Sequence, residues 1–393
     1  MKTLILKKNE ERRLLAGHLW VYSNEIDCET SPLKNFTPGE IVEIRAANNK
    51  FLGKGYINPH TLLCARLLSS DPKTTIDVDF FITKIEDALR RREMCFTQPS
   101  YRLIFSESDL LPGLIVDRFD STLVVQLNTA GMENLKEIII EALVKVIKPK
   151  AILLRNNSSM RTTEGLPSYI EAAHGEPEES VVIEENGITF NAPIKTGQKT
   201  GWFYDQRLNR IRLIPYVKDK NVLDVFSYCG AFGILAAVNQ AKQITCIDSS
   251  ETALEQLKQN AALNNVKDKT TTINADAFLA LRELQLTKQL FDVVILDPPA
   301  FIKRQKDIAA GTEAYLRLHR TALRVLQKNG ILLTTSCSLH LSRDMLLDIL
   351  RKAALAEKRQ IFIFEQLHQA QDHPIHPAII ETNYLKGFIL LAK

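Results

Sequence analysis

Apolar and polar positions follow three different patterns along the chain, and the first covers residues 1–73. Three short, mostly apolar runs lie there, at Ile41–Arg45, Gly53–Ile57 and Leu62–Leu68. Glycine and proline residues separate them, and both residue types mark turns between strands. This spacing predicts a small β barrel that forms a module of its own over residues 1–73.

The second pattern, over residues 74–185, mixes helical periodicity with strand-like runs. Apolar residues recur at helical spacing in Asp79–Met94 and in Leu135–Ile147. Strand-like runs are expected at residues 102–105, 113–117, 123–127 and 151–155. The mixture predicts an α+β domain, and the acidic stretch Glu176–Glu185 is its expected end.

In the third pattern, over residues 186–393, strands and helices alternate. Runs rich in Val and Ile predict strands at residues 222–226, 244–248, 271–275, 291–297 and 331–335. Helices are expected from near Gly233, at Glu251–Asn264 and at Thr312–Leu326. Right-handed crossovers between such elements give a mainly parallel sheet with helices on both faces. An open, doubly wound α/β domain is therefore predicted.

Composition narrows the class of protein. The chain has 393 residues, which favours two or three domains, and 45% hydrophobic with 24% charged residues is typical of a globular protein. No apolar run approaches the roughly 20 residues of a membrane-spanning helix. The first residues, Met1–Arg13, lack the features of a secretory signal. We therefore expect a cytoplasmic protein without a membrane role.

The charge and the cysteine content identify no particular partner, disulfide or metal. The 50 basic and 46 acidic residues nearly cancel, so an RNA partner is permitted but not required. Arg90, Arg91 and Arg92 either contact RNA phosphates or form a solvated helix face. Six cysteines without a CxxC pair favour neither a disulfide framework nor a zinc site. His373 and His376 lack metal-ligand companions, so no metal is expected.

The turn after the first strand of the third region is the first candidate site. In VLDVFSYCGAFG, Asp224 lies in the strand, while Gly230 and Gly233 lie at the turn into a helix. Glycine lets the backbone approach a ligand, and a helix N-terminus offers oriented donors. The segment is not a GxGxxG fingerprint, which weakens a dinucleotide interpretation. A tight turn that serves only the fold is the alternative.

Acidic residues also follow the next two strands. Asp248 ends the second strand, near the spacing of roughly 20 residues at which a carboxylate binds ribose hydroxyls. Asn274, Asp276, Ala277 and Phe278 follow the third strand, where a carboxylate can accept the adenine amino hydrogen and a ring can lie against the base. Each Asp alone could be a helix cap. Together, the carboxylates favour adenosine binding.

The fourth and fifth strands end in groups suited to a base and to nucleophilic chemistry. In Asp297-Pro298-Pro299-Ala300-Phe301, the prolines make a rigid loop that can hold a planar base while Phe301 packs on it. Cys337 follows the fifth strand, and a thiolate there is a potent nucleophile. The alternatives are a simple strand-ending turn and an inert core cysteine.

A polar and aromatic block, GQKTGWFYDQRLNR, precedes the sheet. Lys199, Tyr204, Asp205, Gln206 and Arg207 could order a cofactor carboxylate or an RNA phosphate. A helix N-terminus with Asp205 in its first turn is the structural interpretation, and both can hold.

These motifs, with TSCS and the terminal DHPIHPAIIETNYLKGF, resemble the S-adenosylmethionine-dependent large-subunit ribosomal RNA cytosine-C5 methyltransferase I family over nearly the whole chain. LLAGHLWVYSNEI and GYINPHTLLCARLL resemble its RNA-binding PUA domain, and RLIFSESDLLPGLIVDRFDSTLVVQ resembles its central domain. The resemblance implies an α/β protein with a PUA-like barrel (1–73), a central α+β domain (74–185) and a Rossmann-like class I methyltransferase sheet (186–393).

The resemblance also implies roles for single residues. Cys337 would attack cytosine C6, and Asp297 would hydrogen bond the pyrimidine edge, with Pro298, Pro299 and Phe301 around the substrate. Asp248 would bind the ribose and Asp276 the adenine. The full set implied for S-adenosylmethionine is Lys199, Tyr204, Gln206, Arg207, Asp224, Phe226, Ser227, Gly230, Phe232, Gly233, Asp248, Ser249, Asn274, Asp276, Ala277, Phe278 and Asp297. The implied substrate is 23S ribosomal RNA, and a homodimer is possible.

Some alternatives stay open. Methylation of a guanine or adenine nitrogen needs no thiol, and an RNA-binding ribosome-assembly factor needs no chemistry at all. A dehydrogenase is disfavoured by the missing glycine fingerprint. Ala300 stands where the family often has Lys, with Lys303 nearby, and the base that removes the C5 proton is unassigned. The sequence identifies neither the modified nucleotide nor whether naked RNA or a ribosomal precursor is the substrate.

Overall fold

The computed structural model describes residues 1–393, and the chain divides into two compact units. Unit 1 comprises Met1–Val181, Pro193–Tyr204 and Gln371–Thr382. Unit 2 comprises Val182–Ala192, Asp205–Ala370 and Asn383–Lys393. Two segments that the sequence assigned to the third domain, residues 193–204 and 371–382, thus belong to unit 1. The domain boundaries at residues 73 and 185 stay predictions.

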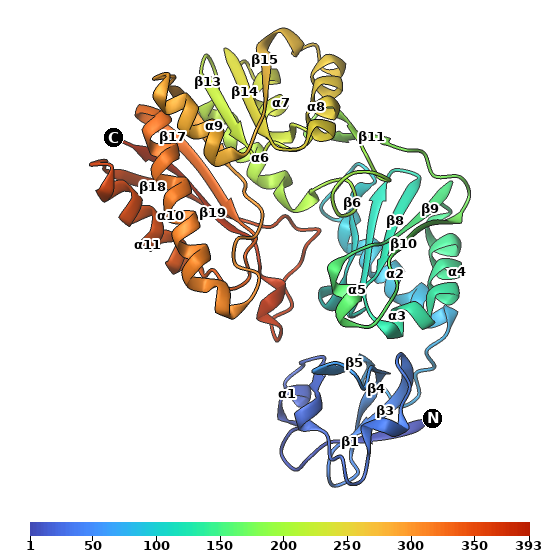
Figure 1. Cartoon of the computed structure of the whole chain (residues 1–393). Coiled ribbons are helices and arrows are strands. Elements are labelled where there is room, and N and C mark those ends of the chain that lie inside the picture. The colour runs from blue at the N-terminus through green and yellow to red at the C-terminus, as the bar shows by residue number, and fades with distance from the viewer. The chain divides into compact units, whose positions relative to one another are not determined.

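Unit 1 begins with a five-stranded sheet (blue in Figure 1). In pairing order its strands are β1 (Lys2–Ile5), β3 (Glu40–Arg45), β4 (Phe51–Ile57), β5 (Leu63–Ser69) and β2 (Trp20–Tyr22), and a short helix, α1 (Arg12–Leu15), joins β1 to β2. Gly55 in β4 has a packing reason, because a Cβ there would lie 2.1 Å from the carbonyl oxygen of Arg66 in β5. The three strands predicted in this region are present.

A second five-stranded sheet of unit 1 carries helices. Its strands in pairing order are β10 (Tyr169–His174), β9 (Ala151–Asn156), β8 (Thr122–Leu127), β7 (Leu114–Phe119) and β6 (Ser100–Phe105). The helices are α2 (Val78–Glu93), α3 (Ala130–Asn134), α4 (Lys136–Ile147) and α5 (Ser159–Thr163). Asp77 caps α2 by accepting a hydrogen bond from the Phe80 amide at 3.0 Å. Phe81 and Ile85 of α2 pack with Ile139 and Leu143 of α4 in one apolar core.

The three arginines of α2 have three different environments. Arg90 is exposed and pairs with Asp87 one turn earlier. Arg91 is half-exposed and lies 2.9 Å from Asp109. Arg92 is buried and forms a two-bond pair with Asp109, at 2.7 and 2.5 Å. Arg92 therefore neither faces solvent nor is available to RNA phosphates; it joins α2 to the segments of Asp109 and Asp372.

Unit 2 contains a seven-stranded sheet and a two-stranded one. The large sheet has the pairing order β15 (Thr270–Asn274), β14 (Gln243–Asp248), β13 (Asn221–Val225), β16 (Phe291–Leu296), β17 (Leu326–Ser336), β19 (Lys386–Ala392) and β18 (Ile361–His368). Its neighbours pair in parallel except at β19, which is antiparallel to both β17 and β18. The small sheet pairs β11 (Val181–Glu185) with β12 (Ile188–Ala192).

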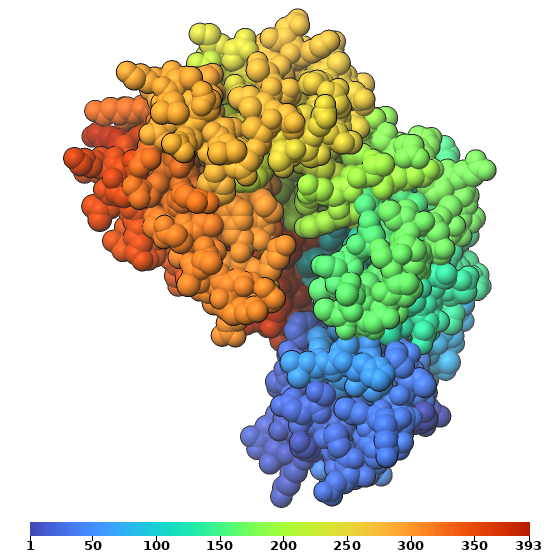
Figure 2. Space-filling view, in the orientation of Figure 1, coloured from blue at the N-terminus to red at the C-terminus, as the bar shows by residue number.

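Helices cover both faces of the large sheet (Figure 1). They are α6 (Arg207–Leu213), α7 (Ala231–Val238), α8 (Glu251–Leu263), α9 (Ala277–Leu286), α10 (Ile308–Val325) and α11 (Arg343–Ala356). In the space-filling view, yellow to orange atoms of α8, α9 and α10 form much of the visible surface of unit 2 (Figure 2). The inner strands β13, β16 and β19 are buried, as their near-continuous apolar sequence requires, whereas the residues of the edge strands β15 and β18 are mostly half-buried or exposed.

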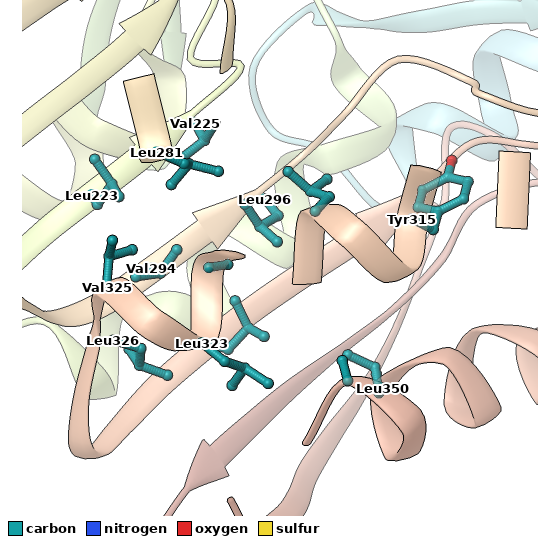
Figure 3. Close-up of a cluster of buried hydrophobic side chains, with 14 of the residues drawn as sticks. Leu223, Val225, Leu281, Val294, Leu296, Tyr315, Leu323, Val325, Leu326 and Leu350 are labelled. Atoms are coloured by element: carbon teal, nitrogen blue, oxygen red, sulfur yellow. The ribbon is translucent and has the colours of Figure 1, made fainter. Parts of the chain in front are cut away.

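Alternation along β13 separates the two faces. Leu223 and Val225 point into an apolar core shared with α9, α10 and α11, which also contains Leu281 and Leu323 (Figure 3). Asp224, between them, points to the opposite face, where α7 lies. None of the helices combines the length and apolar character needed to cross a membrane.

Candidate active site at the carboxyl edge of the large sheet

The strand order of unit 2 reverses at β13, which has β14 on one side and β16 on the other. Open α/β sheets bind ligands outside the carboxyl ends of strands at such a reversal. Asp248 and Asn274 are register partners at the ends of β14 and β15, and Asp297 follows β16 directly. The structure therefore brings the predicted strand-end residues of unit 2 to one edge of its sheet.

Asp224 is the most unusual carboxylate of this edge. It is 1% exposed, and its Oδ2 accepts a hydrogen bond from the Gly233 amide at 2.9 Å. Its buried Oδ1 has no hydrogen-bond partner. Burial, with the nearby charges of Asp297 and Asp248, raises the pKa of Asp224 to about 7. An unpaired buried carboxylate oxygen is costly unless a ligand supplies a donor.

Both glycines of the turn occupy positions where a Cβ would meet neighbouring atoms. Gly230 has a φ of 83°, and a Cβ there would lie 2.5 Å from Leu257 Cγ. A Cβ on Gly233 would lie 2.8 Å from Cys246 Sγ and 3.2 Å from Asp224 Oδ2. Gly233 therefore lets α7 lie directly against Asp224, whereas Gly230 leaves room for Leu257 of α8.

The remaining residues of this turn have mainly backbone roles. The amide of Ser227 donates to the Ile247 carbonyl at 3.0 Å, which ties the turn to β14. Phe226 has a φ of 65° and is half-buried. Phe232 is buried in α7, and the guanidinium carbon of Arg210 lies 5.7 Å from its ring centroid. Of the three, only Phe226 leaves a sizeable side-chain surface for a ligand.

Asp248 fixes the loops around it. Its Oδ2 accepts from the Tyr228 amide and its Oδ1 from the Ser250 amide, both at 2.9 Å. Ser249 is exposed beside it, and the Asn274 side chain donates to the Asp248 carbonyl at 3.2 Å. A half-buried carboxylate held in this way has further lone pairs for hydroxyl donors.

Asp276 is the N-cap of α9, as the structural interpretation expected. Its Oδ1 accepts from the amides of Phe278 and Leu279, at 2.9 and 3.1 Å. Both bonds use Oδ1, so capping leaves Oδ2 for a ligand. Ala277 is buried, whereas the half-buried ring of Phe278 carries the guanidinium of Arg317 4.3 Å from its centroid. The capping and the ligand-binding interpretation of Asp276 are therefore compatible.

The loop after β16 presents an aromatic ring beside a rigid proline pair. Pro298 is buried and Pro299 is exposed. The half-buried Phe301 ring lies 4.8 Å from the Tyr315 ring, 6.2 Å from Phe278 and 6.4 Å from Phe226, centroid to centroid. The aromatic groups from four elements thus form one cluster along the sheet edge.

Asp297 joins the ends of two strands. Its Oδ1 accepts hydrogen bonds from Thr335 Oγ1 at 2.6 Å and from Gln206 Nε2 at 2.8 Å. Gln206 is itself held, since its Oε1 accepts from the Asn209 side chain at 2.7 Å. Thr335 precedes Cys337 by two residues, so these bonds tie the aspartate loop to the cysteine loop.

Cys337 is half-buried, whereas the serines on both sides of it are buried. The hydroxyl of Tyr315 lies 2.8 Å from Ser336 Oγ and 2.9 Å from Ser338 Oγ. Ser338 Oγ also accepts from the amide of Ile302 in the aspartate loop, at 3.2 Å. The sulfur is therefore not sealed in the apolar core, and a polar network holds its backbone.

Arg207 is buried in unit 2 and its Nε lies 3.4 Å from Glu185 Oε2. Two other predicted cofactor residues, Lys199 and Tyr204, belong to unit 1. Lys199 is exposed, with its Nζ 5.0 Å from the Phe203 ring centroid. Tyr204 is buried and donates to the Arg118 carbonyl at 3.0 Å. Their cofactor roles stay predictions.

Thr335, Tyr315 and Lys386 are residues of this site that sequence reasoning did not assign. Thr335 and Tyr315 carry the hydrogen bonds described above, and Lys386 donates to two carbonyls of the cysteine loop. The sequence marked two of them only by position, since Thr335 lies within the motif TSCS and Lys386 within YLKGF. Tyr315 lies in neither motif.

The donor set fits S-adenosylmethionine better than a metal ion. Asp224 offers an unpaired, buried oxygen for the cationic methionine end, and Asp248 and Asp276 offer oxygens to ribose and adenine. Phe278 offers a half-buried ring. No group of three or more His, Cys, Asp and Glu side chains is placed to hold a metal ion.

Comparisons with known proteins agree with this fit. Residues 4–70 match the PUA-like domain family, and residues 160–386 match the S-adenosylmethionine-dependent methyltransferase family. The chain is 39% identical over 391 residues to the ribosomal RNA large subunit methyltransferase I of Aliivibrio fischeri (strain MJ11), and 98% of each chain is covered. It is 37% identical over 389 residues to the protein of the same name from Shewanella frigidimarina, again covering 98% of each.

A solved structure, SMU.776 complexed with SAH, covers 100% of both chains with a TM-score of 0.85 at 21% identity, which shows a shared fold. The predicted fold class, with its PUA-like domain and Rossmann-like methyltransferase sheet, is thereby confirmed. The family matches also confirm S-adenosylmethionine as the predicted cofactor.

Proposed function

Because this chain belongs to the ribosomal RNA large subunit methyltransferase I family, we propose that it methylates C5 of a cytosine in 23S ribosomal RNA through a covalent bond to Cys337. The relatives' name supports the RNA substrate. The resemblance of the motifs to cytosine-C5 enzymes supports the atom that is methylated. The PUA-like domain supports binding of the RNA, and a cytoplasmic location belongs to the same proposal.

One observation carries the proposal. Thr335 Oγ1 donates to Asp297 Oδ1 at 2.6 Å, which fastens the loop of the half-buried Cys337 to the loop of Asp297. A nucleophile for C6 and an acceptor for the pyrimidine edge therefore stand on strands that are neighbours in the sheet. A nitrogen methyltransferase would need the acceptor but not the thiol.

The residues of the chain then act in sequence. The Cys337 thiolate adds to C6, and the electron pair of the C5–C6 double bond moves through the ring to N3, which takes up a proton. Asp297 accepts a hydrogen bond from that protonated edge and stabilises the adduct. When bound, S-adenosylmethionine supplies an electrophilic methyl group on its sulfonium. After C5 has accepted the methyl group, a base takes the C5 proton and N3 releases the proton that it took up. The C5–C6 double bond re-forms as Cys337 leaves as thiolate.

The cofactor would be held by residues of three strand ends. Asp224 and the glycine turn would receive the methionine end, Asp248 the ribose, and Asp276 with Phe278 the adenine. The half-buried Phe301 and the Pro298-Pro299 pair would line the place of the cytosine. A homodimer stays a prediction.

The experiment that tests the proposal replaces the nucleophile. Cys337→Ala should abolish C5 methylation of 23S ribosomal RNA, measured by mass spectrometry of the modified nucleosides. Cys95→Ala serves as the control. It removes an exposed thiol that is distant from Cys337 in the sequence, and it should leave the methylation rate unchanged.

Two results would contradict the proposal. Methyl transfer by Cys337→Ala at the full rate, with the product a nitrogen-methylated purine, would favour the nitrogen methyltransferase. No binding of S-adenosylmethionine to the intact protein in calorimetry would favour a non-catalytic assembly factor.

A further inference from the structure

Lys386 is a buried cation that supports the loop after Cys337. It begins β19 and is the register partner of Ser336, the residue before Cys337. Its side chain is buried, and its Nζ donates to the carbonyl of Ser338 at 2.7 Å and of Leu341 at 2.8 Å. One ammonium group therefore bridges the first and last parts of the loop between β17 and α11.

No carboxylate forms an ion pair with Lys386, and the charge that acts on it favourably is that of Cys337. Burial lowers the pKa of Lys386 to about 8, and the Cys337 thiolate opposes this shift. Electrostatic coupling is mutual, so a cation that a thiolate stabilises also stabilises that thiolate. Burying an ammonium group without an acidic partner costs free energy of folding. A purely structural role for Lys386 does not account for this cost.

We propose that Lys386 is a positioning residue that fixes the Cys337 loop through two carbonyls and stabilises the thiolate form of Cys337. The proposal rests on the proposed function only for the use of that thiolate in catalysis. The coupling between the two side chains is a property of the protein without its substrate. It can therefore be measured separately.

The other charged and titratable groups around the loop do not take the place of Lys386 as a cation bonded to the loop of Cys337. Arg343 of α11 adds positive charge, but its guanidinium donates to Gln366 and Leu367 of β18. Tyr315 of α10 contributes a hydroxyl that is bonded to Ser336 and Ser338.

Two further titratable groups belong to the neighbouring segments. Asp297, which follows β16, accepts a hydrogen bond from Thr335 of β17 at 2.6 Å. His340 lies in the loop itself and is half-buried. Lys386 is therefore the cation that is bonded directly to the backbone next to the sulfur.

The experiment follows the alkylation of Cys337 by iodoacetamide against pH in the intact protein, with each cysteine peptide quantified by mass spectrometry. In the natural protein, the midpoint of Cys337 should lie below that of the exposed Cys95, which is measured in the same sample. Burial alone would have the opposite effect, because desolvation raises a thiol's pKa. A Cys337 midpoint at or above that of Cys95 overturns the proposal without any variant.

Variants of Lys386 sharpen the result. Lys386→Met should raise the Cys337 midpoint by about one pH unit, the lower end of the shift that one neighbouring opposite charge produces. Lys386→Arg should restore most of the low midpoint, because it keeps the charge. Lys352→Met removes an exposed lysine of α11 and should change nothing.

The outcomes separate this proposal from the proposed function. An unchanged Cys337 midpoint in folded Lys386→Met shows a purely structural lysine and overturns the inference. Persistent C5 methylation by Cys337→Ala would overturn the proposed function while leaving the alkylation profiles as they are. The methylation rate of Lys386→Met should fall most at low pH and recover in part at high pH, which loss of structure would not produce.

Discussion

Asp109 in unit 1 and Asp224 in unit 2 are two almost completely buried carboxylates whose surroundings differ. Asp109 of unit 1 and Asp224 of unit 2 are both 1% exposed. Asp109 accepts two hydrogen bonds from Arg92 and a further one from the Phe105 amide at 2.6 Å. Asp224 accepts one bond from Gly233, and its other oxygen has no partner.

The difference separates a carboxylate whose oxygens are all used within the fold from one that keeps an unpaired oxygen which a ligand could use. A buried carboxylate whose lone pairs all accept hydrogen bonds within the protein has none free for a ligand. Removing that carboxylate leaves its cation buried without a partner. A buried acid without a cation is desolvated, so its pKa rises and it becomes ionised only near neutral pH. Of the two, the unpaired acid is the better functional candidate.

The largest effect is expected when the satisfied carboxylate is changed. Asp109→Asn leaves the guanidinium of Arg92 buried without a counter-ion, so the free energy of unfolding should fall by about 3–5 kcal/mol. Denaturant unfolding followed by circular dichroism measures this. Glu137→Gln, which removes an exposed charge on α4, is the control and should change it by less than about 0.5 kcal/mol. An equally small loss for Asp109→Asn would contradict a structural role.

Changing the unpaired carboxylate should weaken cofactor binding. Asp224→Asn keeps the acceptor for Gly233 but loses the charge, so the affinity for S-adenosylmethionine should fall about 10- to 100-fold, as for loss of one charge-assisted hydrogen bond of about 1.5–3 kcal/mol. Titration calorimetry measures the affinity. Asp268→Asn, an exposed acid before β15, is the matched control. Unchanged affinity in Asp224→Asn would remove Asp224 from the cofactor site.

The raised pKa of Asp224 should be visible in how the free energy of unfolding of the natural protein depends on pH. Folding raises the pKa of Asp224 from 3.8 to about 7, so the native state binds an extra proton between these values. The stability that this proton contributes is complete below about pH 4 and is lost as the pH rises through about 7, with a slope of at most about 1.4 kcal/mol per pH unit. Asp224→Asn should remove this part of the slope, as measured by unfolding at several pH values. Identical pH profiles for the two proteins would show that Asp224 is ionised throughout.

The smallest effect should come from the half-exposed partner of Asp109. Arg91 lies 2.9 Å from Asp109, but its side chain is 47% exposed. Arg91→Ala should therefore cost less than about 1 kcal/mol of unfolding free energy, because water screens such a pair. Thermal unfolding beside Asp109→Asn gives the comparison. A loss as large as that of Asp109→Asn would mean that the arginines act as one network.

The periodic parts of the fold were predictable from sequence. β14 was predicted at residues 244–248 and lies at Gln243–Asp248, because a run of apolar residues between polar ends suits a buried parallel strand. α2 was predicted at residues 79–94 and lies at Val78–Glu93. β17 was predicted only from residue 331, since Gln327, Lys328 and Asn329 interrupt its apolar pattern.

Non-local contacts were not predictable in the same way. The acidic stretch before residue 186 was interpreted as the end of a domain, yet Glu185 is buried against Arg210, with Nε and Oε1 2.5 Å apart. Nothing in the local sequence marks which arginine will meet which acid. Asp372 likewise accepts from the amide of Arg102, which places a segment of the last 25 residues in unit 1.

The same limit applies to the candidate site. The strand ends identified Asp224, Asp248 and Asp297, because parallel strands bring their carboxyl ends to one edge. The unpaired oxygen of Asp224 depends on what surrounds it in three dimensions. The support of the Cys337 loop by Lys386 depends on strand register, which sequence spacing does not reveal.

The position of β19 has a consequence for biosynthesis. This strand lies between β17 and β18 although it follows both in sequence, and it pairs antiparallel with each. During translation, the segment that becomes β18 therefore has no neighbour to join until residues 386–392 have emerged from the ribosome. Because Lys386 arrives with that same strand, a nascent chain that has already folded its cofactor side would still lack the ammonium beneath its cysteine. On the proposed coupling, the pKa of the Cys337 thiol should therefore fall only after β19 has joined the sheet.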